Sequence, residues 1–144
     1  MAQFWRLLVW FVCSLYLWVL PVEGSVAIQF FDAENLAIVE GGVKAKIHLA
    51  CVRIPPVTQP YGKLALEELK ELIGDRLTGV RAFRRDRVGR VLGEIYADGE
   101  NVNLQMVARG LAKFDRSFTY ARECAGYAEA EEQAKQKRLG LWAK

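Results

Sequence analysis

The sequence predicts an α+β fold of five strands and three helices. Three observations lead to this prediction. Apolar and polar residues alternate near the start, an amphipathic segment with helical spacing follows in the middle, and two capped apolar segments lie near the C-terminus. Five strands with a helix between the third and the fourth is the order of an OB-fold β-barrel. Nucleic-acid binding is a common task of that fold, but a fold alone does not fix a function.

The first three strands are expected at residues 26–31, 36–40 and 43–52. The first two are rich in apolar and β-branched residues, and Gly41-Gly42 supplies a tight turn before the third. The third strand alternates apolar residues with two lysines and a histidine, as a half-buried strand does. Three prolines then stop it: Pro55, Pro56 and Pro60.

The middle of the chain is expected to form one helix and the last two strands. Leucines recur at helical spacing over residues 64–73, opposite a charged face, and Gly74 closes the helix. Residues 77–83 and 91–96 are strand-like. Asp98-Gly99 after them predicts a hairpin turn.

Two helices are expected at the C-terminal end. Residues 104–109 form a short one, with Asn103 as its N-cap and Gly110 after it. Residues 121–138 form a longer one that ends before Leu139-Gly140. The chain shows neither internal repeats nor a low-complexity linker, so residues 25–144 are expected to be one domain.

The N-terminus predicts a targeting segment. Arg6 is followed by fourteen residues without a charge, positions 7–20, which as a helix would span roughly 21 Å, less than the hydrocarbon core of a bilayer. Small or short residues then place a cleavage site after Gly24. We therefore expect residues 1–24 to be a signal peptide; the alternatives are a retained membrane anchor and a buried core helix.

Charge and cysteine usage limit the function only in part. Twenty Lys and Arg against 17 Asp and Glu give a net charge of +3, so attraction to nucleic acid depends on where the charges lie. Cleavage would leave two cysteines, Cys51 and Cys124. Export to an oxidising compartment favours a bridge between them, and two buried free thiols are the alternative.

Several ordered motifs together resemble the staphylococcal nuclease (thermonuclease-like) family over residues 30–142. They are QPYGK at 59–63, DRVGRVLG at 86–93, IYADGENVN at 95–103, MVARGLA at 106–112, AEA at 128–130 and GLW at 140–142. The resemblance implies a five-stranded OB barrel with three helices, in agreement with the pattern above. It also implies that Cys51 lies near Cys124, which favours the disulfide.

Active members of that family are calcium-dependent phosphodiesterases that cut DNA and RNA. Their chemistry needs carboxylates for the calcium ion, a Glu that activates the attacking water, and two arginines that neutralise charge on the phosphoryl group. The acidic motif of the family falls on residues 32–35, so that Asp32 is kept and the metal-binding Asp becomes Glu34.

The other catalytic positions of the family diverge further. The first phosphate-binding Arg falls on His48, which lacks the guanidinium fork. In the motif whose proline matches Pro55, the metal-binding Asp falls on Arg53 and the water-activating Glu on Pro56. The second phosphate-binding Arg matches Arg90 and is intact.

Charge at these positions predicts a pseudonuclease without calcium. The four acidic positions of the family carry −4, whereas Asp32, Glu34, Arg53 and Pro56 carry −1. A cationic side chain about 4 Å from a bound cation costs roughly 4 kcal/mol per unit of cation charge at an effective dielectric of 20. Loss of the general base alone typically lowers the rate by about 10²- to 10⁴-fold.

An arginine-rich segment predicts a phosphate-binding patch. Its five members are Arg81, Arg84, Arg85, Arg87 and Arg90. They would hold single-stranded nucleic acid or another polyanion beside the diverged site, with Tyr61, Phe83 or Tyr120 as stacking partners. The alternative is a solvated loop, in which Asp86 balances part of the charge.

Two other functions remain open from the sequence. One is an envelope protein-interaction module, such as an accessory subunit that an uncleaved leader holds at a membrane complex. The other is an active secreted or envelope nuclease with a diverged site. A rebuilt catalytic site would use the lone histidine, His48, as the base, with Asp32 or Glu34 orienting it. The expected location is the periplasm, the outer face of the membrane or the exterior.

Overall fold

The computed structural model describes residues 26–118 and 122–143 of the chain. The predicted leader, residues 1–24, and its cleavage site lie outside the described residues, as does Tyr120. In the described part, no helix combines the length and the apolar character needed to cross a membrane.

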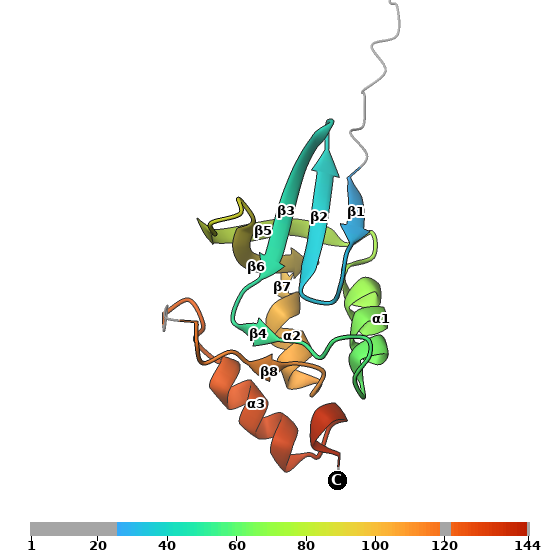
Figure 1. Cartoon of the computed structure of the whole chain (residues 1–144). Helices are drawn as coiled ribbons and strands as arrows, with labels where there is room; N and C mark the ends of the chain where they lie inside the picture. Colours follow the sequence, from blue (N-terminus) through green and yellow to red (C-terminus); the bar gives the residue numbers. More distant parts are fainter. Residues whose placement is uncertain (1–25, 119–121, 144) are drawn as a thin grey trace, which may run out of the picture.

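The main sheet confirms the predicted α+β class. Strands β1 (Ala27–Phe30), β2 (Asn35–Glu40) and β3 (Val43–Leu49) form an antiparallel meander. β3 then pairs in parallel with β6 (Val91–Ala97), which pairs with β5 (Leu77–Arg85). The order β1-β2-β3-β6-β5, with the parallel pair at its centre, curls into the barrel drawn in Figure 1.

Three α-helices and a short 3₁₀-helix complete the domain. α1 (Gly62–Ile73) precedes β5 in sequence, α2 (Val102–Ala108) follows the two-residue strand β7 (Glu100–Asn101), and α3 (Tyr127–Gln136) comes late in the chain. The 3₁₀-helix η1 (Gly140–Trp142) ends it. Figure 1 shows α2 below the barrel, between α1 on one side and α3 on the other.

The third strand is shorter than predicted. β3 ends at Leu49, and the chain resumes as β4 (Val52–Arg53), which pairs with β8 (Lys113–Phe114) in a separate two-stranded sheet. Cys51 lies between the two strands with φ 64°, a left-handed conformation that ends strand pairing. The predicted disulfide is confirmed, because Cys51 is bonded to Cys124 across 73 positions.

Helix boundaries also differ from the prediction. The N-cap of α2 is Asn101, whose side chain accepts a hydrogen bond from the N–H of Leu104, so the expectation that Asn103 caps the helix is wrong. Asn103 is instead buried within α2. α3 begins only at Tyr127, because Gly126 has a φ of 86° and interrupts the helical conformation.

The buried core lies between the barrel and the helices. Asn103 connects the residue after β3 with the middle of β6: its amide nitrogen donates to the carbonyl oxygens of Ala50 and Gly93, at 2.9 and 3.1 Å, and its oxygen accepts from the N–H of Ile95 at 3.1 Å. The largest fully buried apolar side chains among the described residues are Leu36, Leu49, Leu69, Ile73, Ile95, Met106 and Tyr127.

A close backbone crossing fixes the C-terminus. The N–H of Leu141 donates to the carbonyl oxygen of Gly110 at 2.8 Å. A Cβ atom on Gly110 would lie 2.3 Å from the carbonyl oxygen of Leu139, and one on Gly140 would lie 2.3 Å from the carbonyl oxygen of Gly110. Both glycines have positive φ, so this crossing needs residues without a side chain.

Candidate functional site

In the acidic turn between β1 and β2, the side chain of Asp32 accepts hydrogen bonds from backbone N–H groups of the same turn. One oxygen of Asp32 accepts from the N–H groups of Glu34 and Asn35, at 2.7 and 2.8 Å. The amide of Asn35 donates to both carboxylate oxygens, at 3.0 and 2.9 Å. Asp32 therefore acts as an Asx-type cap of the turn, with both oxygens engaged.

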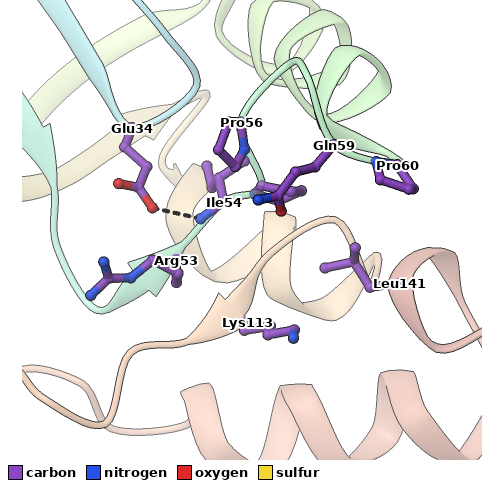
Figure 2. Close-up of a pocket in the computed structure, with 9 residues that line it drawn as sticks. Glu34, Arg53, Ile54, Pro56, Gln59, Pro60, Lys113 and Leu141 are labelled. Atoms are coloured by element: carbon purple, nitrogen blue, oxygen red, sulfur yellow. Dashed lines mark hydrogen bonds between the residues drawn. The ribbon is translucent and has the colours of Figure 1, made fainter.

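Glu34 is turned toward the backbone of the neighbouring strand. Its Oε1 accepts from the N–H of Ile54 at 2.7 Å, the contact drawn as a dashed line in Figure 2. Its own carbonyl oxygen accepts from the N–H of Leu49. These bonds join the β1–β2 turn to β3 and to the residues after β4, so Glu34 links three segments of the site.

The side chains of His48 and Arg90 both hydrogen-bond to the side-chain oxygen of Asn35. Oδ1 of Asn35 lies 2.9 Å from Nδ1 of His48 and 2.9 Å from a terminal nitrogen of Arg90. Because Arg90 donates to this oxygen, it is the amide acceptor, and His48 shares it by donating from Nδ1. Asp86 fixes the other side of Arg90, with its carboxylate accepting from Nε at 2.7 Å and from the backbone N–H at 2.9 Å.

The charge states follow from this packing. Burial lowers the pKa of His48, and the nearby Arg90 lowers it further, although Glu34 opposes the shift. A neutral imidazole therefore predominates at neutral pH. For Asp86, partial desolvation acts to raise the pKa, but the hydrogen bonds from Arg90 and Val88 outweigh it and hold the pKa below the ordinary value.

Arg53 and Pro56 occupy the positions at which the family resemblance places a metal ligand and the general base. Arg53, with 62% of its side chain exposed, pairs with Asp115 at 2.8 Å. Desolvation acts to raise the pKa of Asp115, but hydrogen bonds from Ser117 and the charge of Arg53 hold that pKa below its usual value. Pro56 has no group that can accept a proton.

The residues present do not fit the calcium ion that the resemblance implies. Calcium takes six to eight oxygen ligands in proteins. In the described ranges, 26–118 and 122–143, no group of three or more His, Cys, Asp or Glu side chains is placed to hold a metal ion. Asp32 and Glu34 accept from backbone N–H groups, and a guanidinium stands where the resemblance puts a third carboxylate.

A pocket of about 480 Å³ extends from the diverged site toward the C-terminus. Figure 2 shows Glu34 on one side of it, Lys113 and Leu141 on the opposite side, and Gln59 between them. Arg53 and Lys113 are directly opposite in the β4–β8 register. The remaining lining residues are Ile54, Pro55, Pro56 and Pro60, so the wall behind the charged groups is largely apolar.

The predicted arginine patch follows the β5–β6 hairpin, and its members are held differently. Arg90 is anchored by Asp86 and Asn35, whereas Arg81 lies 3.6 Å from the buried carboxylate of Glu94. Arg85 donates to the carbonyl oxygen of Gly89 at 3.1 Å. Arg84 and Arg87 are exposed, on the end of β5 and in the turn after it. The structure thus gathers the five on one hairpin.

The predicted stacking partners differ from one another. Phe83 is half-buried: its ring lies tilted beside that of Phe118, with 6.1 Å between the centroids, and the guanidinium of Arg81 lies 5.3 Å from its centroid. Tyr61 is exposed in a left-handed conformation before α1.

Two site residues were not found from the sequence. Asp115, the partner of Arg53, is 62 positions away, and no local pattern connects them. Asn35 lies within the acidic motif, but its bridging role between the β1–β2 turn and the hairpin depends on the β2–β3 register, which places Asn35 opposite His48.

Comparisons with known proteins agree with the fold. The sequence model of the family described as "Staphylococcal nuclease homologue" matches residues 46–144. "Staphylococcal-like nuclease CAN1" of Arabidopsis thaliana is 36% identical over 84% of this chain and 35% of its own length. An "uncharacterized endonuclease" of Escherichia coli is 29% identical over 94% of this chain and 87% of its own length.

A protein of the same name in Haemophilus influenzae is 28% identical over 81% of this chain and 64% of its own length. The chain thus spans about a third of the plant relative but most of the length of the E. coli one.

Proposed function

The chain belongs to the staphylococcal nuclease family, and from this premise we propose that it binds nucleic acid without calcium-dependent cleavage. The observation that carries the proposal is the Arg53–Asp115 ion pair beside Pro56. A guanidinium and a proline stand where family members need a metal ligand and a base. Neither side chain can perform that chemistry.

The remaining acidic groups support the same conclusion. Asp32 and Glu34 accept hydrogen bonds from backbone N–H groups. A divalent cation would compete with those bonds and would meet the charge of Arg53, which Asp115 offsets only in part. The turn is stable as it stands, because both carboxylates already have partners.

The groups that recognise phosphate are better preserved. Arg90 is held by Asp86 and Asn35 and is oriented without help from a ligand. Pre-organised guanidinium groups bind phosphate with little loss of side-chain entropy. Arg85 and Arg87 extend the cationic surface along the same hairpin, so a phosphodiester chain is the ligand class that suits it.

Calcium titration and a nuclease assay test the proposal. The protein is purified in the form that the cell produces, and calcium binding is measured by calorimetry. Cleavage of single-stranded DNA is then followed with calcium or with chelator. We expect binding of the DNA, no heat from calcium and no chelator-sensitive cleavage.

A restored variant makes the test sharper. Arg53→Asp with Pro56→Glu returns two acidic groups, and Asp115→Asn removes the carboxylate that would otherwise repel the new Asp. We expect this triple variant to bind calcium more tightly than the parent chain. Equal calcium binding by both would contradict the proposed cause of the loss.

An active endonuclease is the second candidate, and the names of the bacterial relatives favour it. In that case His48 would replace the missing base, because its neutral imidazole lies in one hydrogen-bond network with Arg90. Chelator-sensitive cleavage that disappears in His48→Gln would support this candidate. Cleavage of DNA by the parent chain, whether or not a chelator abolishes it, would overturn the proposal that the chain is a pseudonuclease.

The proposal includes a location outside the cytoplasm. The Cys51–Cys124 disulfide supports it, because structural disulfides persist mainly in oxidising compartments. A chain that begins at Ser25 in an intact-mass measurement would favour a secreted or periplasmic protein. A mass that includes residues 1–24 would favour the alternative of a membrane-anchored accessory subunit.

A further inference from the structure

We propose that the outer face of β1, β2 and β3 carries a single strand of nucleic acid, with Phe31 stacking on a base and Lys44 and Lys46 contacting phosphates. The inference rests on the proposed nucleic-acid binding and deepens it. It adds a surface separate from the arginine hairpin, on residues that none of the motifs of the sequence includes.

Phe31 is an aromatic residue that the core does not use. Its side chain is 57% exposed, although the sequence suggested a continuous apolar strand there. The amino group of Lys44 lies 5.3 Å from the centroid of its ring, and the same amino group donates to Oε1 of Gln29 at 2.7 Å. These contacts hold the ring on the outer face of the sheet, with a cation beside it.

The register places the cations in a row on that face. Lys44, Lys46 and His48 alternate with residues that point to the interior, and they lie opposite Val39, Ala37 and Asn35 of β2. Ile47, between Lys46 and His48, and Leu49, after His48, are buried. Residues on one face of a strand follow each other at roughly 6.6 Å, so the row presents regularly spaced polar groups along β3.

The row continues into the hairpin. His48 lies opposite Leu92 of β6, and Leu92 lies opposite Arg84 of β5. His48 and Arg90 also share the oxygen of Asn35. A nucleic-acid strand that contacts the hairpin arginines can therefore pass over His48 to Lys46 and Lys44 without leaving the sheet.

The exposed ring of Phe31 beside Lys44 distinguishes this face from a site that would bind any polyanion. Bases stack on exposed aromatic rings in single-strand binding proteins, while cations follow the phosphate backbone. The acidic groups near Phe31 are Asp32 and Glu34, and both are engaged by backbone N–H groups, which offset their negative potential. Polyphosphate has no bases and would not use the ring.

The molecule supplies an internal control. Phe30, the neighbour of Phe31, points the other way: it is half-buried against the core, and Lys70 of α1 lies 5.7 Å from the centroid of its ring. Lys63 and Lys70 are both exposed on α1. Lys63→Gln with Lys70→Gln therefore removes the same charge as Lys44→Gln with Lys46→Gln, away from the proposed surface.

The experiment measures fluorescence anisotropy of labelled oligo(dT) with the full chain and its variants. We expect Phe31→Ala to weaken binding roughly tenfold, since loss of a stacking aromatic has effects of this order. Phe31→Trp should retain binding, and its additional fluorescence should be quenched by the oligonucleotide. Lys44→Gln with Lys46→Gln should lower the salt slope by about 0.7 for each phosphate that the protein no longer neutralises.

Polyphosphate binding and the α1 control double variant complete the test. Polyphosphate affinity should be unchanged in Phe31→Ala, and oligo(dT) affinity should be unchanged in the control. If Arg85→Gln with Arg87→Gln weakens binding but the Phe31 and Lys44/Lys46 variants do not, this inference is wrong and the proposed function stands. If the parent chain does not bind oligo(dT), both this inference and the proposed nucleic-acid binding are wrong.

Discussion

Two regions of the molecule use carboxylates in different ways. On α3, the side chain of Glu131 is 2% exposed; one carboxylate oxygen accepts from the N–H of Phe114, and Arg116 and Lys135 pair with the other at 2.7 and 3.1 Å. At the diverged site, Glu34 has one backbone partner. Desolvation acts to raise the pKa of Glu131, but the bonds from Arg116 and Lys135 dominate and lower it.

The difference separates what the fold needs from what catalysis needs. Glu131 joins α3 to β8 and to the loop after β8, so it supports the fold. Glu34 only joins neighbouring segments at the edge of the barrel. Residues at the site can therefore depart from the pattern of the family while the supporting network stays complete, so the same fold accommodates an arginine and a proline there.

The disulfide is expected to have the largest effect on stability. It ties the strand break beside the site to the turn before α3 across 73 positions. In the chain-entropy model, a loop of this length contributes roughly 4 kcal/mol. Reduction should lower the urea midpoint accordingly. Cys51→Ser with Cys124→Ser should show the same lower midpoint with or without reductant; a parent chain indifferent to reductant would contradict the prediction.

Asn103→Ala is expected to have the second-largest effect on stability, after loss of the disulfide. Asn103→Ala leaves two carbonyl oxygens and one N–H without their amide partner in the core, and should cost about 3 kcal/mol. Asn101→Ala, two positions earlier, removes a helix cap and the contact of that amide with the Tyr127 hydroxyl, and should cost less, about 1 kcal/mol. Urea unfolding of both variants checks the order, and equal destabilisation would show that the core amide is not a support of the barrel.

The two carboxylates can be compared directly. Glu131→Gln keeps the shape but removes the charge that holds Arg116 and Lys135, at a cost of about 2 kcal/mol. Glu34→Gln keeps an acceptor for the N–H of Ile54 and should cost less than about 1 kcal/mol. If thermal unfolding gives the opposite order, the division between a supporting region and a replaceable site is wrong.

The smallest effect is a pH dependence at His48. Its pKa in the folded state lies below the ordinary 6.5, so between these two values the unfolded chain binds more protons than the folded one. Stability is therefore full above about pH 6.5 and falls as pH decreases through the folded value. His48→Gln should remove this part of the slope in urea unfolding at several pH values.

The carboxylates titrate in a separate range. Asp86 and Asp115 have pKa values below the ordinary 3.8, so their contribution is lost only at lower pH. A parent chain and a His48→Gln variant with the same slope between about pH 5 and 7 would argue against a buried, neutral imidazole at this site.

Much of the fold follows from local patterns. Alternation in β3, helical spacing in α1 and the Asp98-Gly99 turn predicted the order of elements, and the family motifs predicted the disulfide. The break at Cys51 was missed, because apolar alternation continues through a residue that the structure holds at positive φ. Asn103 was misplaced, because Asn is a good N-cap and the burial of this side chain depends on its hydrogen bonds to the residue after β3 and to the middle of β6.

The site was less predictable than the fold. The positions of Asp32, Glu34, His48, Arg53 and Pro56 followed from motif spacing. The Arg53–Asp115 pair did not, since it depends on the pairing of two strands of two residues each, β4 and β8. The exposure of Phe31 also escaped a pattern of apolar residues, because composition does not tell which face of a strand end is covered.

The glycine crossing at the C-terminus limits how such a sequence can diverge. A side chain at Gly110 or Gly140 would meet backbone atoms, which cannot swing aside as the end of a long side chain can. An acid at the catalytic turn faces no comparable barrier to replacement. We therefore expect these two glycines to outlast the acidic motif among diverging relatives. A search for nucleases that have lost their catalytic groups should give more weight to the crossing than to the former active site.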